Sequence, residues 1–283
     1  MSPSKKTFLI TGVSSGLGAA IARRALAAGH QVAGTVRSEA DRVAFESTDS
    51  SGNARGYLLD VTDEAAVQPT VEKIGPVDVL VVNAGYGHEG TLEESSMQDL
   101  RRQFEVNVFG AVATIKAVLP GMRERRRGNI LIVTSMGGMV AFPGIPFYNG
   151  SKFAMEGIAE SLAQEVAPFG VRVTAVAPGS FRTDWSGRSM VRAPRSVADY
   201  DELFDPIRAT RQASSGHQLG DPDKAGDALL ALIEAEKPPV HLVLGSDALR
   251  IVAAGRQRVQ DDLENWAELS RSTDHADGGA ALG

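Results

Sequence analysis

The chain has 283 residues, of which 43% are hydrophobic and 23% are charged, a balance typical of a globular protein with a sizeable core. Its formal net charge of -6 argues against general binding to nucleic acids or to anionic membranes. Cysteine is absent and the 5 histidines show no metal-ligand spacing, so disulfides and thiolate chemistry are excluded and no metal site is expected.

The sequence shows no targeting or membrane segment. The first residues, Met1–Lys6, lead directly into an apolar run and leave no room for the apolar region of a signal peptide. No uninterrupted apolar stretch approaches the roughly 20 residues that a membrane-spanning helix needs. We therefore expect a soluble, cytoplasmic protein without a membrane span.

Short apolar runs alternate along the chain with longer helical patterns, which indicates βα units and a parallel sheet with right-handed crossovers. Runs rich in Val, Ile or Leu, as in strands buried on both faces, predict strands at about 7–11, 31–36, 55–59, 77–83, 129–134, 172–177 and 240–244. Helices are predicted at about 17–28, 39–46, 63–73, 97–123, 148–168, 223–235 and 247–270. The expected fold class is α/β, a single doubly wound Rossmann domain with a seven-stranded parallel sheet and helices on both faces.

The length suits one such domain with additions. We place the domain at residues 1–250, a helical C-terminal extension at 251–271 and a tail of low apolar content, expected to be disordered, at 272–283. The connection after the predicted sixth strand spans about forty residues, which is longer than ordinary connections. It predicts a substrate lid at about 181–218 that is mobile without ligand.

The first predicted strand stops at a glycine-rich turn, Thr11–Gly18, and a helix begins at once. Gly12 permits the tight turn, Gly16 lets the backbone approach a pyrophosphate, and Gly18 lets the helix pack close to the strand. The helix N-terminus then offers free N–H groups to the phosphates. The spacing T-G-x-x-x-G-x-G differs from the generic G-x-G-x-x-G, but the strand–turn–helix context predicts a dinucleotide site. The other turn residues expected at the cofactor are Ser14, Ser15 and Leu17.

The end of the second predicted strand indicates which cofactor is preferred. Folds that prefer NAD place Asp or Glu there to bind the ribose 2′-hydroxyl, whereas this chain has Val36 followed by Arg37. A guanidinium suits a 2′-phosphate, so NADP(H) is the preferred cofactor and NAD(H) stays open as the alternative. Ser15 stands where a basic residue often accompanies NADP preference.

Tyr148 and Lys152 are four residues apart and therefore lie on the same face of a helix. A tyrosine ordinarily keeps its proton until about pH 10, and a neighbouring ammonium lowers the tyrosine pKa by favouring the phenolate. Ser135 follows an apolar strand and would present its hydroxyl at the carboxyl edge of the sheet, where ligands of such sheets bind. These three residues predict a proton-transfer site.

Together these motifs resemble the short-chain dehydrogenase/reductase family over residues 5–250, and further matches follow in the family's order. The resemblance implies that Asn107 is a fourth catalytic residue. Val82 and Gly150 depart from the usual pattern without removing a group that has a chemical role. The further cofactor contacts implied by the resemblance are Asp60, Val61, Asn83, Ala84, Gly85, Pro178, Gly179 and Thr183, besides Tyr148 and Lys152. The hydroxysteroid and retinol dehydrogenases form the most similar branch.

The resemblance implies hydride transfer between a nicotinamide and a carbonyl–alcohol pair, an enzyme acting on CH–OH groups. Tyr148 would exchange the proton, Ser135 stabilise the substrate oxygen, Lys152 lower the tyrosine pKa and bond the ribose, and Asn107 support a proton-relay water. Apolar residues near these groups suggest a mostly apolar substrate bound by Met136, Phe142, Phe147, Phe181 and Trp185.

Two further expectations concern partners and the alternative function. The apolar stripe of helix 148–168 and the resemblance suggest a homodimer or homotetramer, although the same stripe could pack within the monomer. A dinucleotide-sensing regulatory protein on the same fold is the alternative from another class. The filled catalytic positions favour the enzyme.

Overall fold

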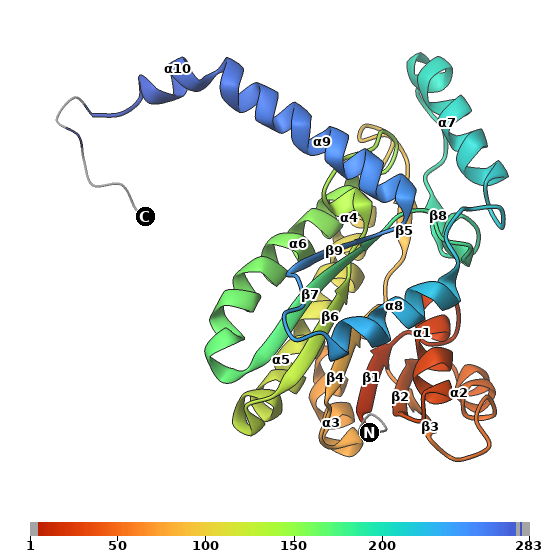
Figure 1. The fold of residues 1–283 in the computed structure, drawn as a ribbon. Helices are drawn as coiled ribbons and strands as arrows, with labels where there is room; N and C mark the ends of the chain where they lie inside the picture. Colours follow the sequence, from red (N-terminus) through yellow and green to blue (C-terminus); the bar gives the residue numbers. More distant parts are fainter. Residues whose placement is uncertain (1–4, 276–277, 279–283) are drawn as a thin grey trace.

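The computed structural model describes residues 5–275 and 278. Its centre is a seven-stranded sheet with the strand order β3-β2-β1-β4-β6-β7-β9, and all its neighbouring strands are parallel (Figure 1). These strands are β1 (Thr7–Thr11), β2 (Gln31–Val36), β3 (Ala54–Leu58), β4 (Val79–Val82), β6 (Gly128–Val133), β7 (Val171–Pro178) and β9 (His241–Leu244). The strand order reverses between β1 and β4, so the predicted doubly wound fold is confirmed.

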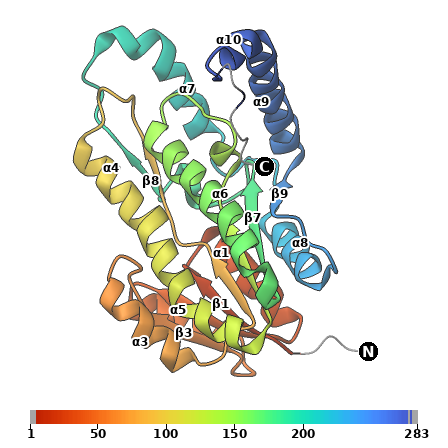
Figure 2. The ribbon, with the colours of Figure 1, turned by 90° about the vertical axis from the view of Figure 1, so that its left-hand side faces the viewer.

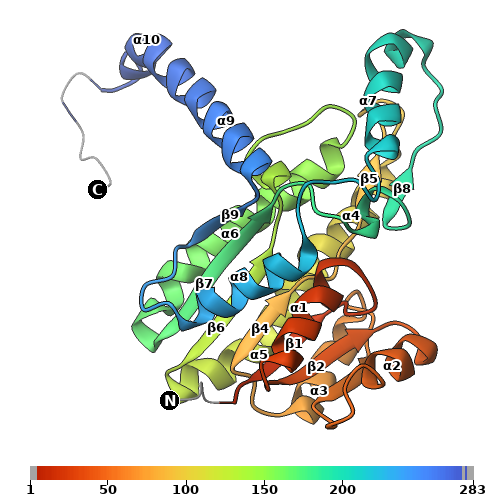
Figure 3. The ribbon, with the colours of Figure 1, turned by 45° about the vertical axis from the view of Figure 1, so that its right-hand side comes forward.

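Helices cover both faces of the sheet (Figures 1 and 3). The helices are α1 (Gly16–Ala27), α2 (Glu39–Glu46), α3 (Glu64–Ile74), α4 (Met97–Phe104), α5 (Gly110–Arg125), α6 (Pro146–Val166), α7 (Asp201–Ala213), α8 (Pro222–Glu234), α9 (Ser246–Asn265) and α10 (Ala267–Arg271). Helices α1 and α8 pack on each other and, with α2, bury side chains against one face. Helices α3, α5 and α6 bury theirs against the other.

The central strands show why the sequence folds in this way. All four residues of β4 are buried, and successive side chains point to opposite faces. Leu80 and Val82 join the core beneath α5 and α6, whereas Val79 and Val81 join the core beneath α1 and α8. An unbroken apolar run is thus required of a strand with a core on each side.

The helix predicted at 97–123 is interrupted by a π-helical turn, η1 (Glu105–Phe109), which separates α4 from α5. The wider turn changes the face that the following side chains present, and such turns occur often at functional sites. The stretch Met97–Arg125 is also long and apolar enough to count as a candidate membrane span by length and composition, with 39% of its apolar window buried. A core helix passes the same test.

Several elements differ from the sequence-based expectation. A two-stranded parallel sheet joins β5 (Gly87–Glu89) to β8 (Met190–Arg192). The segment predicted as a lid thus contains β8 and α7, which stand beside β5 above the sheet edge (Figure 2). At the other end, α9 and α10 extend away from the domain (Figure 1). The disorder predicted for 272–283 falls mostly on residues outside those that the structure describes.

Candidate active site

A cleft of about 1060 Å³ opens at the carboxyl edge of the sheet, between the ends of the central strands and the lid. It brings together nearly all the site residues that the sequence predicted. Those that line it are Gly12, Ser14, Ser15, Gly16, Leu17, Arg37, Asp60, Val61, Asn83, Ala84, Gly85, Ser135, Met136, Phe142, Tyr148, Lys152, Pro178, Gly179, Phe181, Thr183 and Trp185. The remaining three, Gly18, Asn107 and Phe147, lie behind its wall.

The glycine-rich turn has the backbone shape that a phosphate cradle needs. Gly12 and Gly16 have φ values of 74° and 61°, in the region that side chains other than glycine rarely adopt. A Cβ atom on Gly18 would overlap the carbonyl oxygen of Gly12 and the side-chain amide of Asn83. That amide donates hydrogen bonds of 2.9 Å to the carbonyls of Thr11 and Gly12 and so fixes the turn. The N-terminus of α1 therefore faces the cleft with its N–H groups and positive dipole end.

Charged side chains of both signs line the cleft, including three arginines and the carboxylates Asp41, Asp60 and Glu105. Arg37 lines it from the end of β2, and Arg101 and Arg102 line it from α4. The pKa of Asp60 is lowered, first by hydrogen bonds from Thr62 and further by Arg37 and Arg102. The α4 arginines were not predicted, because nothing in the local sequence shows that the first turns of this helix reach the cofactor edge.

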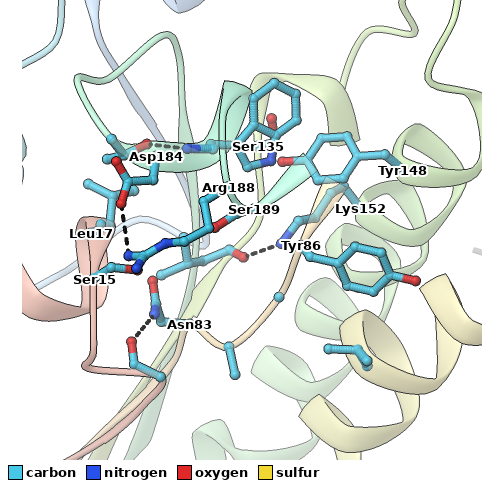
Figure 4. Close-up of a pocket in the computed structure, with 18 of the residues that line it drawn as sticks. Ser15, Leu17, Asn83, Tyr86, Ser135, Tyr148, Lys152, Asp184, Arg188 and Ser189 are labelled. Atoms are coloured by element: carbon cyan, nitrogen blue, oxygen red, sulfur yellow. Dashed lines mark hydrogen bonds and ion pairs between the residues drawn. The ribbon is translucent and has the colours of Figure 1, made fainter. Parts of the chain in front are cut away.

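Ser135, Tyr148 and Lys152 lie together on one side of the cleft, and the hydroxyl end of Tyr148 points toward Ser135 (Figure 4). Ser135 follows β6 by two residues and caps the short helical turn at Met136–Gly138, where its Oγ accepts a 3.0 Å hydrogen bond from the N–H of Gly137. Tyr148 and Lys152 stand on consecutive turns of α6 and are each 7% exposed. The Lys152 Nζ lies 5.8 Å from the Tyr148 ring centroid and donates a 2.8 Å hydrogen bond to the carbonyl of Val133.

Burial dominates the electrostatics of this group. It raises the pKa of Tyr148 to about 12, while the neighbouring Ser135 and Trp185 side chains act to lower it. Burial also lowers the pKa of Lys152 to about 8, which the carboxylate of Glu156 opposes. The expectation that Lys152 brings the tyrosine pKa below its usual value is therefore not met, because burial outweighs the groups that lower it. Tyr148 keeps its proton at neutral pH, as a proton donor must.

Asn107 sits on the π-helical turn and is 2% exposed. Its Oδ1 accepts from the N–H of Tyr86 at 3.1 Å, and its Nδ2 donates to the Tyr86 carbonyl at 3.0 Å and to the Ser151 hydroxyl at 3.2 Å. Asn107 thus joins the loop after β4 to α6, one residue before Lys152. One lone pair of Oδ1 is left for a water molecule.

The substrate side of the cleft is mostly apolar. Trp185 packs on Tyr148 with ring centroids 5.0 Å apart and an interplanar angle of 56°. Its Nε1 is buried beside the Tyr148 hydroxyl, and this N–H acts to lower the pKa of the tyrosine although the two groups are not aligned as a regular hydrogen bond. Phe147 corrects the prediction: it is 5% exposed and stacks on His88 at 5.4 Å, so it supports the wall from behind. The helical period explains this, since adjacent residues of a helix face different directions.

Two buried carboxylates hold the lid to the domain. Glu89 of β5 is fully buried and pairs with Arg192 and Arg211 at 2.8 Å each and with Arg208 at 3.4 Å. Glu94 accepts hydrogen bonds from the N–H groups of Ser196 and Val197 and pairs with Arg195. Removal from water acts to raise the pKa of Glu94, but these hydrogen bonds lower it to about 2.

A second polar group that the sequence did not indicate lies behind Lys152. Glu156, one turn further along α6, accepts from the hydroxyl of Thr134 and pairs with His241 Nδ1 at 2.7 Å. His241 comes from β9, 85 positions away in the chain. Such a contact depends on the packing of the whole sheet, so no local pattern could reveal it.

The fold and this arrangement define the class. Residues 6–191 match the sequence model of the short chain dehydrogenase family. The chain belongs to that family, as its motifs indicated, and it is an oxidoreductase of CH–OH groups that uses a nicotinamide dinucleotide.

Named relatives cover most of the chain. It is 35% identical over 265 residues to a 3-ketodihydrosphingosine reductase of Bacteroides thetaiotaomicron, covering 92% of this chain and 95% of the relative. It is 32% identical over 259 residues to human retinol dehydrogenase 8, covering 85% and 82%. The predicted resemblance to the retinol dehydrogenase branch is thereby confirmed.

Solved structures of the same family are similar to this chain. A short-chain dehydrogenase from Streptomyces avermitilis has 39% identity and a TM-score of 0.90, with 97% of this chain and 100% of that chain covered. The structure of ElxO with NADP bound has 26% identity and a TM-score of 0.71, with 87% and 100% covered.

Proposed function

We propose that this protein is an NADP(H)-dependent oxidoreductase that interconverts a ketone or aldehyde and the corresponding alcohol on a mostly apolar substrate. The observation that carries the proposal is the grouping of Ser135, Tyr148 and Lys152 in the cleft that begins at the glycine-rich turn. Proton-transfer groups and a dinucleotide cradle in one cleft are what hydride transfer to a carbonyl requires.

The residues present fit the cofactor. The cradle at Gly12–Gly18 would hold the pyrophosphate, Arg37 would hold the adenosine half, and Lys152 and Thr183 would hold the nicotinamide half, since all of them line the one cleft. When bound, the cofactor supplies or accepts the hydride at the carbonyl carbon.

The protein's own residues handle the proton. In reduction, the Tyr148 O–H donates its proton to the substrate oxygen as the carbonyl carbon gains the hydride, and the C=O bond becomes CH–OH. Ser135 donates a hydrogen bond to the same oxygen and stabilises its developing negative charge. Lys152 stabilises the resulting phenolate, and Asn107 supports a water through which the proton is replaced.

Three arginines favour NADP(H) over NAD(H). Arg37, Arg101 and Arg102 line the end of the cleft where a 2′-phosphate would lie, and guanidinium groups pair well with phosphate. Asp41 lines the same region, but its carboxylate already accepts a 2.6 Å hydrogen bond from Ser38. NAD(H) is the alternative cofactor.

The apolar lining indicates the substrate class. Met136, Phe142, Phe181 and Trp185 leave few polar groups to bind substrate except those that handle the carbonyl. Two relatives are named for 3-ketodihydrosphingosine and for retinol. We expect an apolar carbonyl or alcohol as the substrate, and turnover in the cytoplasm.

Oxidation of NADPH with a panel of carbonyl compounds of increasing chain length tests the proposal. We expect turnover, with kcat/KM rising with apolar length and lower for NADH. A dinucleotide-sensing regulatory protein would bind NADPH and turn over none of the panel. That result would contradict the proposed enzyme activity and favour the sensor.

A further inference from the structure

Helix α9 leaves the domain after its first turns. Ala248 and Val252 are buried, and Gly255 packs so closely on Val140 that a side chain there would clash. Every residue from 256 to 266 is exposed, so the second half of the helix has no partner within the described chain (Figures 1 and 3). A helical segment of this length is marginal in water unless something packs against it.

The exposed half continues the apolar stripe of the buried half. Val259, Leu263 and Trp266 follow Val252 at spacings of seven, four and three residues, which keeps all four on one face of the helix. The three exposed members are 60%, 63% and 61% accessible. The stripe therefore lies against the domain at one end and is open to solvent at the other.

The charges beside the stripe are segregated along the helix. Arg256 and Arg258 precede Gln260, whereas Asp262 and Glu264 follow it. If a second copy of α9 lies antiparallel about a two-fold axis at Gln260, Arg258 lies at the level of Asp262 of the second copy. At 100° per residue Arg258 and Asp262 fall on the same flank of the stripe, so the two can pair, and the symmetry makes this pair twice.

The charge pattern favours an antiparallel second copy of α9 over a parallel copy and over a lipid surface. A parallel pair would set like charges against each other, which is unfavourable. Helices that lie on anionic lipid have a polar face rich in Lys and Arg, whereas residues 256–271 carry Arg256, Arg258 and Arg271 against Asp261, Asp262, Glu264 and Glu268.

We propose that α9 is a self-association surface: its exposed stripe binds α9 of a second copy of this chain in antiparallel orientation, and the two symmetry-related pairs of Arg258 with Asp262 fix the register. Val259 and Leu263 of the two copies interdigitate at the centre. Trp266 packs beside the opposite helix, and α10 reaches toward the other domain.

The mass of the full chain in solution, measured by light scattering during gel filtration, tests the proposal. The combined change Val259→Asp and Leu263→Asp is expected to halve the mass, because two charges then replace the centre of the stripe. Arg250→Glu is the matched control, since Arg250 is exposed on the opposite face of α9, and its mass should not change. NADPH affinity, measured in parallel, shows whether each variant is folded.

A charge exchange tests the register itself. Arg258→Asp alone and Asp262→Arg alone each place like charges in contact and should raise the dissociation constant of the pair about tenfold or more. The double exchange restores opposite charges and should recover most of the loss. A monomeric mass for the unchanged protein at micromolar concentration overturns the proposal, and so does an unchanged mass for the Val259 and Leu263 variant. Binding of the monomer to neutral phosphatidylcholine vesicles would assign the stripe to a membrane surface instead.

Discussion

At the residue scale, the protonation of Lys152 is set by two opposed effects. Burial lowers its pKa to about 8, and the Glu156 carboxylate, held by Thr134 and His241, acts to raise it. In the proposed mechanism Lys152 must be charged, because it binds the ribose and stabilises the phenolate. Its charge depends on the carboxylate of Glu156, which itself contacts neither the ribose nor the phenolate. Glu156 is a positioning residue in this account.

Glu156→Gln tests that dependence through pH. Without the carboxylate the pKa of Lys152 falls further, so the ammonium loses its proton at lower pH as the pH rises. The alkaline loss of NADP affinity should then begin below about pH 8 and earlier than in the unchanged protein. Glu160→Gln is the control, since Glu160 is 63% exposed on the same helix and lies 3.7 Å from the same histidine. A pH profile of the dissociation constant that is identical in both variants would contradict the role.

Arg37→Ala tests the choice of cofactor. Loss of a charge-assisted hydrogen bond costs about 1.5–3 kcal/mol, so NADPH affinity should fall about tenfold or more. NADH affinity should change little, because NADH lacks the 2′-phosphate. Calorimetric titration with both cofactors measures the difference, and equal losses would remove Arg37 from the 2′-phosphate site.

The sequence predicted those site residues whose role is set by local chemistry. Gly12, Gly16 and Gly18 are required by the shape of one turn, and Tyr148 and Lys152 by the period of one helix. Residues that act through long-range packing escaped prediction, as His241 shows. Phe147 was misplaced because a pattern of apolar residues does not tell which of two neighbours faces the cleft.

At the element scale, the lid is joined to the domain by strand pairing and by buried ion pairs. Its strand β8 pairs with β5, and Glu89 holds arginines from β8 and α7. We therefore expect slow hydrogen exchange in β8 even without ligand. The stretches that slow most on binding NADP(H) or substrate should be those around Trp185 and at 214–216.

Glu89→Gln should loosen the lid. Removal of one partner of a buried ion pair is strongly destabilising, because the remaining charges stay buried and unpaired. Exchange across α7 should become about tenfold faster or more and KM should rise, with little change in the hydride-transfer rate at saturation. Glu202→Gln, an exposed change on α7, is the control. An unchanged exchange rate in α7 would mean that other contacts hold the lid.

The seven central strands were predictable because burial on both faces requires an apolar run. The strands β5 and β8 have three residues each, and 100 or more positions separate their partners in the chain. Strands of three residues are too short to show the two-residue alternation of side chains that predicts a strand. The π-helical turn was hidden for another reason: its side chains follow the same apolar pattern as the helices around it.

At the scale of the whole molecule, the surface predicted for self-association is largely internal. On α6, Ala159, Leu162 and Val166 are buried in the core, and Ala154, Ile158 and Ala163 pack against it. The inner half of the stripe thus packs within the monomer, whereas its outer half is only partly buried, so self-association through this helix stays a prediction. The exposed apolar stripe of α9 is a second candidate surface.

The whole account depends on Tyr148 as the proton donor in a cleft that binds NADPH. The most direct measurement is single-turnover oxidation of bound NADPH by Tyr148→Phe with a carbonyl substrate that the unchanged protein reduces, with Tyr57→Phe on β3 as a matched control. Loss of the donor should slow the step by about 10²–10⁴-fold, while NADPH affinity stays nearly unchanged. If the phenylalanine variant reduced the substrate at a rate close to that of the control, Tyr148 would not be the proton donor and the proposed mechanism would be wrong.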